Sequence, residues 1–421
     1  MAETASTRRV LAASLIGTSI EFYDFYVYTT AAALVFGELF FPKASHAAQQ
    51  LLAFATIGVA FVARPLGSLF FGHFGDRIGR KSTLVASLLT MGISTTLVAL
   101  LPTYSSAGWA AALLLCVLRF GQGFGLGGEW GGAALLAVEH APPGKRARYG
   151  MFPQLGAPVG FVAANGLFLI LVALLTRQQF HDWGWRIPFA LSAGLVVIGL
   201  WIRLKLAETP EFAAALKEAP PPAVPFGELV ARHSGALVVG TVGAIACFAL
   251  YYVATAFALG YGTKTLGYSM QDFLGVQLGA ILFMAGGIYA SAWMADRHYD
   301  ERRVLMAGCV GTMAAGLLMA PLMTSGSLFE VFIFLALSLT LMGFVYGPLG
   351  GWLPSLFPAR VRYTGVSMAF NVAGVLGGGL TPLVAQSLAA RHGLAAVGLY
   401  SGGAALISLV ALALSGRGRT A

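Results

Sequence analysis

The chain has 421 residues, of which 57% are hydrophobic and only 10% are charged. A soluble domain carries about 25% charged residues, so this composition excludes an ordinary water-soluble protein and makes lipid the expected solvent. The formal net charge of +9 would suit a nucleic-acid partner, but the positions of the charges, described below, indicate a different cause.

Apolar stretches of about twenty residues, the length that crosses a bilayer as an α-helix, recur along the whole chain. No small-residue cleavage site follows the first stretch, so we interpret it as a retained span and not as a signal peptide. The stretches predict twelve transmembrane helices, at residues 10–37, 50–72, 83–102, 109–138, 148–175, 186–206, 235–261, 271–294, 303–322, 328–352, 363–388 and 394–415.

The one long loop, residues 207–233, is rich in proline and falls at the middle of the chain. Residues 142–150 before the fifth span resemble residues 357–365 before the eleventh. Such repeats are typical of transporters whose halves move around a midplane site. We therefore predict an all-α membrane protein with twelve transmembrane helices in two pseudo-symmetric halves, a six-helix bundle at 1–206, a cytoplasmic linker at 207–233 and a second bundle at 234–421.

The distribution of Lys and Arg predicts the orientation in the membrane. If the N-terminus is cytoplasmic, 19 of the 26 basic residues, Arg203 among them, fall in the tails and loops on that side. Cytoplasmic loops of membrane proteins carry such an excess. The sequence thus predicts a multi-pass membrane protein with both termini in the cytoplasm, and we expect the membrane to be a bacterial inner membrane. The basic charge is a topology signal and not a sign of nucleic-acid binding.

In the first span, Glu21, Asp24, Phe25 and Tyr28 share one helix face. Two neighbouring carboxylates in a medium of low dielectric constant suit a group that must bind and release a proton. We predict proton coupling by Asp24 or Glu21, with Asp24 preferred, and substrate contact by Tyr28. The alternative is that one carboxylate only neutralises a buried arginine.

In the second span, Arg64 lies eight residues, or about 12 Å, before the helix end, inside the hydrocarbon zone. A guanidinium there needs a carboxylate, and its planar fork matches a carboxylate substrate. We predict that Arg64 contacts the substrate, with a structural ion pair as the alternative. In the C-terminal half, Tyr252 and Asn371 are the preferred substrate contacts, although such residues are more often polar groups at helix contacts.

Residues 72–81, GHFGDRIGRK, follow the second span and match the G-x-x-x-D-R-x-G-R-K motif of the major facilitator superfamily. A carboxylate at a helix end can pair with arginines and with the positive N-terminus of a facing helix. We predict a conformational latch formed by Asp76, Arg77 and Arg80, with a second copy at Asp296 after the eighth span. The alternative is a basic loop that only sets topology.

The fourth span contains Arg119-Phe120-Gly121-Gln122-Gly123, which resembles a superfamily motif whose arginine is linked to proton coupling. Glu129 lies ten residues on, within about 80° of Arg119 and about 20° of Gln122 around the helix, so the three can share one face. Charges in a span are costly to insert, which favours function over packing. We assign Arg119 and Glu129 to proton coupling and Gln122 to substrate contact.

Several further segments resemble the metabolite:proton symporter family within that superfamily. This resemblance implies symport of an organic acid such as 2-oxoglutarate, citrate, shikimate or an aromatic acid, or of proline or betaine, without naming the substrate. The segments are residues 19–25, 63–67, 127–132, 183–189, 208–212 and 358–365.

The sequence therefore predicts a proton-coupled symporter that takes up a small mono- or dicarboxylate by alternating access. The alternatives are a proline or betaine symporter and a proton antiporter that exports drugs or metabolites, although residues 154–160 lack the Gly-Pro step usual in such exporters. Scattered histidines and the absence of a phosphate-binding loop predict no enzyme activity, no cofactor and no metal. The expected partners are a small organic anion, protons and lipid, with no nucleic acid, and the chain is expected to act as a monomer.

Overall fold

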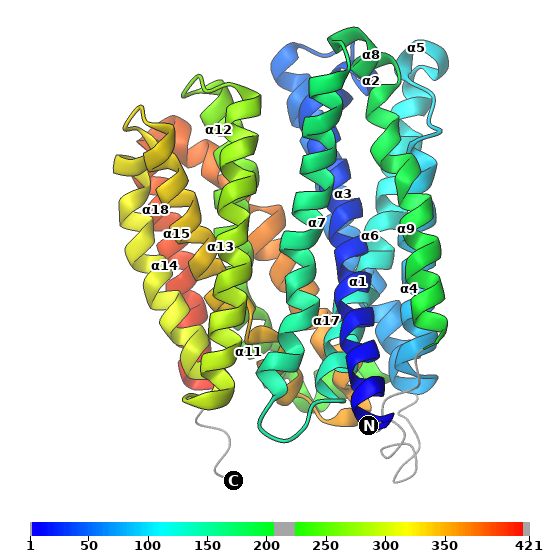
Figure 1. Cartoon of the computed structure of the whole chain (residues 1–421), viewed down its shortest axis with the longest axis vertical. Coiled ribbons are helices and arrows are strands. Elements are labelled where there is room, and N and C mark those ends of the chain that lie inside the picture. Colours follow the sequence, from blue (N-terminus) through cyan, green and yellow to red (C-terminus); the bar gives the residue numbers. More distant parts are fainter. Residues whose placement is uncertain (1, 206–223, 416–421) are drawn as a thin grey trace.

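The computed structural model describes residues 2–205 and 224–415, and these form two bundles of helices, seen side by side in Figure 1. The N half consists of α1 (Ala2–Ala31), α2 (Gly37–Phe40), α3 (His46–Arg77), α4 (Arg80–Val98), α5 (Tyr104–Ala107), α6 (Trp109–Val138), α7 (Arg146–Leu174), α8 (Arg177–Asp182) and α9 (Ile187–Leu204). The C half consists of α11 (Pro225–Tyr252), α12 (Ala258–Lys264), α13 (Met270–Arg297), α14 (Glu301–Met323), α15 (Leu328–Tyr346), α16 (Leu349–Trp352), α17 (Arg362–Ala373) and α18 (Thr381–Leu414).

Most predicted spans coincide with the helical stretches to within about five residues, whereas α1 and α11 begin eight and ten residues before their predicted spans. Twelve spans are confirmed. Among the described residues, eleven helical stretches are long and apolar enough to cross a membrane. The last of them, Ala359–Leu414, has 56 residues and would be about 84 Å long as one helix, far more than a bilayer of about 30 Å needs. It breaks at Gly393, whose φ of 76° suits glycine, and the chain turns back there (Figure 1).

Part of the predicted linker, residues 207–223, lies outside the described residues. Its remaining part is mostly helical, because α11 already begins at Pro225. A break at His233, with φ −130° and ψ 23°, separates this first part of α11 from the span that follows. The linker boundaries therefore stay a prediction.

Glycines bring α3 and α6 into close contact in the N half. A Cβ atom on Gly127 would lie 2.6 Å from the backbone nitrogen of Ser68, and one on Gly123 would overlap the backbone of Ala60. Only residues without a side chain allow membrane helices to approach so closely. This packing holds the part of α3 that carries Arg64 against α6.

Wide π-helical turns interrupt the corresponding spans of the two halves. Ala32–Phe36 lies between α1 and α2, and Val253–Phe257 lies between α11 and α12. The two segments begin 221 residues apart, close to half the chain. Such turns are frequent at functional sites, and here each follows the part of a span that faces the other half.

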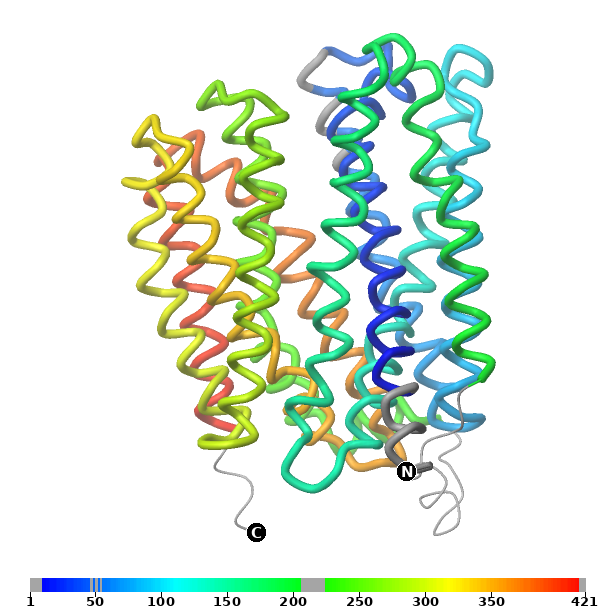
Figure 2. The backbone as a smooth tube through the Cα atoms, viewed as in Figure 1, coloured from blue at the N-terminus to red at the C-terminus, as the bar shows by residue number. Residues whose placement is uncertain are grey.

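The two halves touch on one side of the membrane and separate toward the other. We call the side where α1 begins and α18 ends the terminal side, and the tube in Figure 2 shows the halves converging there. The contacts there join α17 to α3 and α6, and α16 to α7. Any substrate path from the terminal side is therefore covered in this conformation.

Candidate functional site

Arg64 is buried between two aromatic rings. Its guanidinium carbon lies 4.9 Å from the ring centre of Phe25 and 4.6 Å from that of Phe61. Within the described part of the chain Arg64 forms no ion pair, and its Nε has no hydrogen-bond partner. The charge is therefore available to an anion that enters from outside the protein.

A central cavity lies beside Arg64, between the two halves. It combines one cation, one carboxylate and several hydroxyl groups among aromatic rings, and the buried hydroxyl of Tyr346 has no hydrogen-bond partner. An apolar pocket with a few convergent polar groups is the usual form of a small-molecule site. The lining residues are Glu21, Phe22, Phe25, Tyr26, Arg64, Leu126, Ala157, Cys247, Phe248, Tyr251, Tyr252, Met342, Tyr346, Phe370 and Asn371.

The two carboxylates of α1 lie in different surroundings. Glu21 lines the central cavity, and its Oε2 has no hydrogen-bond partner. Asp24 is fully buried and does not line this cavity. The hydroxyl of Ser192 donates to Asp24 Oδ1 over 2.6 Å, whereas Oδ2 has no partner. A bound substrate would meet Glu21 directly and Asp24 only through the protein.

Arg119, Gln122 and Tyr28 form one buried cluster behind the cavity. Arg119 donates to Gln122 Oε1, and its guanidinium carbon lies 3.9 Å from the ring centre of Tyr28. The Gln122 amide donates to the backbone oxygen of Asp24 over 3.0 Å and to Thr95 over 2.9 Å. Neither Gln122 nor Tyr28 lines the central cavity. In this conformation they position α1 and do not face the space available to a substrate.

Glu129 is paired with an arginine that sequence reasoning missed. Its Oε1 accepts a hydrogen bond from Arg203 Nη2, and its Oε2 accepts one from Ser87 over 2.6 Å. Glu129 is thus separated from Arg119, which lies ten residues or about 15 Å away along α6. The count of basic residues placed Arg203 in a loop on the terminal side. This is wrong, because Arg203 lies in α9 with only 3% of its surface exposed. Its position inside the predicted span 186–206 was the available signal.

The two predicted contacts of the C half both line the central cavity but differ in their bonding. The Tyr252 ring packs edge-on against Phe61, with ring centres 5.6 Å apart. The Asn371 amide group donates across the interface of the halves to Ser68 over 2.9 Å and to the backbone oxygen of Gly127 over 3.1 Å. Asn371 therefore joins the halves on the closed side while it borders the cavity.

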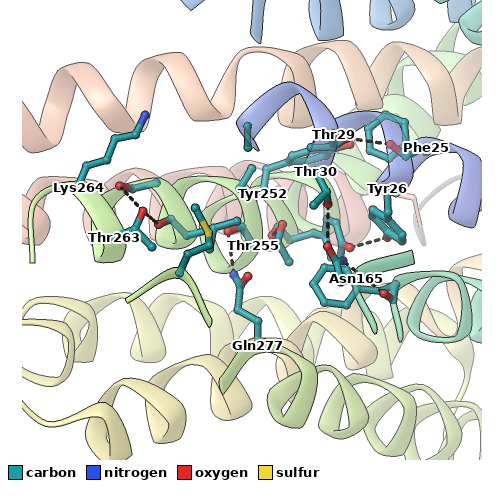
Figure 3. Close-up of a pocket in the computed structure, with 17 residues that line it drawn as sticks. Phe25, Tyr26, Thr29, Thr30, Asn165, Tyr252, Thr255, Thr263, Lys264 and Gln277 are labelled. Atoms are coloured by element: carbon teal, nitrogen blue, oxygen red, sulfur yellow. Dashed lines mark hydrogen bonds between the residues drawn. The ribbon is translucent and has the colours of Figure 1, made fainter. Parts of the chain in front are cut away.

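A second, outer cavity continues from the central one toward the open side. Figure 3 shows its polar side chains, in which Thr30 donates to Asn165 over 2.7 Å and Gln277 donates to the backbone of Thr255 over 2.9 Å. Phe25, Tyr26, Tyr251 and Tyr252 line both cavities. The Tyr251 hydroxyl donates to that of Tyr26, so a hydrogen bond between the halves stands where the cavities meet.

Asp76 binds the N-terminus of α17 on the closed side. Its carboxylate accepts hydrogen bonds from the backbone nitrogens of Tyr363 at 3.0 Å and Thr364 at 2.9 Å, and from the Thr364 hydroxyl at 2.7 Å. Arg80 pairs with the same carboxylate at 3.0 Å. A carboxylate is favourable at a helix N-terminus, where backbone N–H groups are unpaired. Asp76 therefore joins the N half to the start of a helix of the C half.

Two more charged groups, Glu139 and Arg362, extend this network between the halves. Glu139, which sequence reasoning missed, lies 3.5 Å from both Arg80 and Arg362 and so joins α6 to the start of α17. Arg77 is exposed, and its Nη1 lies 3.1 Å from His73 on its own helix.

Asp296 makes the corresponding contact in the opposite direction. It lies at the end of α13 and accepts hydrogen bonds from the backbone nitrogens of Ala147 and Arg148, both over 2.9 Å. These nitrogens belong to the N-terminus of α7. Each half thus contributes one carboxylate that binds a helix start in the other half, as the internal repeat predicts.

Comparison with known proteins identifies relatives along nearly the whole chain. The sequence profile of the Major Facilitator Superfamily matches residues 14–382. The inner membrane metabolite transport protein YhjE of Escherichia coli K12 is 48% identical over 414 residues, 97% of this chain and 94% of that protein. The shikimate transporter of the same organism is 40% identical over 394 residues, 90% of this chain and 87% of that protein. The proline/betaine transporter of Escherichia coli K12 is 32% identical over 393 residues, 90% of this chain and 77% of that protein.

The fold also matches solved structures. The proton:xylose symporter XylE, bound to 6-bromo-6-deoxy-D-glucose, superimposes with a TM-score of 0.79 over 99% of this chain and 96% of that chain. The two sequences are only 15% identical, so this similarity concerns the fold.

Proposed function

Because this chain belongs to the major facilitator superfamily and is a membrane transporter of metabolites, we propose that it is a proton-coupled symporter that takes up a small organic acid. The observation that carries this proposal is Arg64, a guanidinium that lines the central cavity and has no ion-pair partner among the described residues. A carboxylate of the substrate would occupy the fork of this side chain and neutralise its charge.

Proton coupling follows from the position of Glu21 in the same cavity. An anion bound at Arg64 brings a negative charge close to Glu21, and like charges in a medium of low dielectric constant disfavour each other. Binding of the anion therefore favours the protonated form of Glu21, or of Asp24 one turn further along α1. Substrate and proton then enter together. Arg119 holds Asp24 in place through Gln122, which supports its assignment to proton coupling.

The positive-inside distribution of Lys and Arg supports a cytoplasmic location for both termini. With that orientation the latched terminal side is cytoplasmic, and the outer cavity faces the periplasm. The present conformation is then the one that receives substrate from outside. A single chain contains both halves of the alternating-access unit, which supports a functional monomer.

A second candidate, symport of a zwitterion such as proline or betaine, is supported by the aromatic lining of the cavity. The rings of Phe25, Tyr26, Tyr251 and Tyr252 lie near both Arg64 and Glu21. Aromatic faces and a carboxylate would bind the ammonium group, while Arg64 bound the carboxylate. Relatives named as proline/betaine transporters are consistent with this alternative.

Uptake into proteoliposomes tests both candidates. The panel consists of labelled shikimate, 2-oxoglutarate, citrate, proline and glycine betaine, each measured with and without an imposed proton gradient. Gradient-driven accumulation of an acid supports the proposal, and accumulation of only proline or betaine supports the second candidate. Accumulation that is equal with and without the gradient would contradict proton coupling.

A further inference from the structure

The Glu129–Arg203 pair is buried inside the N half and lines neither cavity between the halves. Besides Glu129, Arg203 contacts α4, because its Nη1 donates to the backbone oxygen of Leu84 over 2.6 Å. Taking two charges out of water is expensive, and a buried ion pair is weak evidence for a gain in stability. The pair therefore calls for a functional explanation.

The guanidinium of Arg203 also lies directly against α1. A Cβ atom on Gly17 would lie 3.3 Å from Arg203 Cζ and closer still to Nη2. Glycine is unfavourable in a helix interior by about 1 kcal/mol relative to alanine, but here it leaves room for the guanidinium. Gly17 precedes Glu21 by four residues, so both occupy the same face of α1, about 5–6 Å apart. Arg203 is thus one helical turn from Glu21.

Charged groups from three other helices surround Glu21. Arg64 on α3 lines the same cavity as Glu21. Arg203 on α9, paired with Glu129 of α6, lies against α1 at Gly17, one helical turn from Glu21. On the C half, the hydroxyl of Tyr363 in α17 donates to the backbone oxygen of Gly128, next to Glu129, over 2.5 Å. Arg203 is thus paired with one carboxylate and lies one turn from a second.

We propose that Arg203 is a positioning residue for proton transfer, which pairs with Glu129 in the present conformation and with Glu21 after Glu21 has lost its proton. This inference depends on the proposed proton symport. When the substrate leaves Arg64, the Glu21 carboxyl group releases its proton and becomes a buried anion. Arg64 lines the same cavity but forms no ion pair with Glu21 among the described residues, whereas Arg203 lies one helical turn away. Arg203 turns to Glu21, and Glu129, left without its partner, accepts the proton. The net charge of the three groups does not change, because Glu129 gains the proton that Glu21 loses and Arg203 stays protonated.

The positions of the three groups give the transfer a direction. Along α1, Gly17 and therefore Arg203 lie nearer the terminal side than Glu21 does. Glu129 lies in the second half of α6, which ends on the terminal side at Val138. The proton thus moves from the substrate cavity into the interior of the N half, toward the terminal side and away from the open outer cavity.

Gly17→Ala is the sharpest test, because the new methyl group would occupy the space of the Arg203 guanidinium and displace it without removing its charge. Gly194→Ala on α9, where a Cβ atom meets nothing within 4 Å, is the matched control. Arg203→Gln removes the charge, and Arg203→Lys restores it. The double variant Arg203→Gln/Glu129→Gln leaves no unpaired buried charge and shows whether a loss reflects misfolding.

Each variant is reconstituted and assayed with the panel compound that the wild type accumulates. We expect the ratio of uphill accumulation to downhill exchange to fall at least about tenfold in Gly17→Ala, Arg203→Gln and the double variant, with recovery in Arg203→Lys. Wild-type ratios in Gly17→Ala, or an equal loss of exchange and accumulation at every pH, would overturn the role of Arg203. Absence of proton-driven accumulation by the wild type itself would overturn the proposed symport as well.

Discussion

Arg64 is the single residue on which substrate binding is expected to depend most. We predict that Arg64→Lys and Arg64→Ala each weaken binding by at least about tenfold, or about 1.4 kcal/mol. Lysine keeps the charge but loses both the bidentate fork and the stacking between Phe25 and Phe61. Isothermal calorimetry with a panel compound that the wild type binds measures the change. Arg391→Lys is the control, since Arg391 is exposed and lines neither cavity. Wild-type affinity in folded Arg64→Lys would favour a structural role.

Asp24 and Glu21 differ in a way that transport assays can separate. In Asp24→Asn the amide oxygen can still accept the hydrogen bond from Ser192, so the variant mimics the protonated carboxyl group and should retain substrate exchange. It should fail at uphill accumulation. A potential of 100 mV is worth about 2.3 kcal/mol per charge, or roughly fifty-fold in accumulation.

Glu21→Gln is the matched variant for this comparison. We expect a loss of uphill accumulation there as well, because Glu21 lines the central cavity and is the group that passes its proton to Glu129 in the transfer proposed above. Both proteins are assayed in vesicles, first with substrate on both sides and then with an imposed proton gradient. If Asp24→Asn still concentrates substrate on the gradient, the required proton carrier is Glu21 or Glu129.

At the scale of helices, the closed state depends on two helix starts that are bound by carboxylates of the other half. We predict that Asp76→Asn leaves substrate affinity unchanged but slows transport, because the latch acts on the equilibrium between conformations and not on the site. Charge-assisted hydrogen bonds are about twice as strong as neutral ones, so a shift of about 1–3 kcal/mol in this equilibrium is expected.

Asp296→Asn should have a smaller effect than Asp76→Asn. Asp296 binds two backbone nitrogens and Arg148, and the Arg148 contact is long at 3.6 Å. Asp76 binds three groups of α17 in addition to the buried Arg80. Calorimetry combined with initial transport rates measures both variants. A larger loss in Asp296→Asn would show that the second latch, and not the first, controls closure.

For the whole molecule, the two latches predict which side is accessible. In a protein without its three native cysteines, Thr29→Cys in the outer cavity should react with a membrane-impermeant maleimide added outside cells. The additional change Asp76→Asn should lower this reactivity several-fold, because it favours the conformation open to the other side. Ser105→Cys is the control, since this residue is exposed in α5, in the connection between α4 and α6 on the open side. Equal reactivity with and without Asp76→Asn would refute the latch.

Features that depend on short stretches of chain were determined by the sequence alone. The length of each apolar run is set by the thickness of the bilayer, so twelve spans could be counted before any contact was known. In the structure the last two spans belong to one helical stretch, and the break at Gly393 separates them. The positions of Asp76 and Asp296 near the ends of two helices were also predictable, since the two residues occupy corresponding points of an internal repeat.

Which polar groups meet inside the bundle was decided only by the tertiary structure. Glu21 and Asp24 are three residues apart on one helix, yet only Glu21 reaches the central cavity. The partner of Glu129 is Arg203, 74 residues away, and not a neighbour on its own helix. Periodicity places side chains around one helix, whereas the angle and distance between helices depend on the packing of all of them. The sequence alone could therefore propose most charged residues of the site, although not Arg203 or Glu139, and it could not propose their partners.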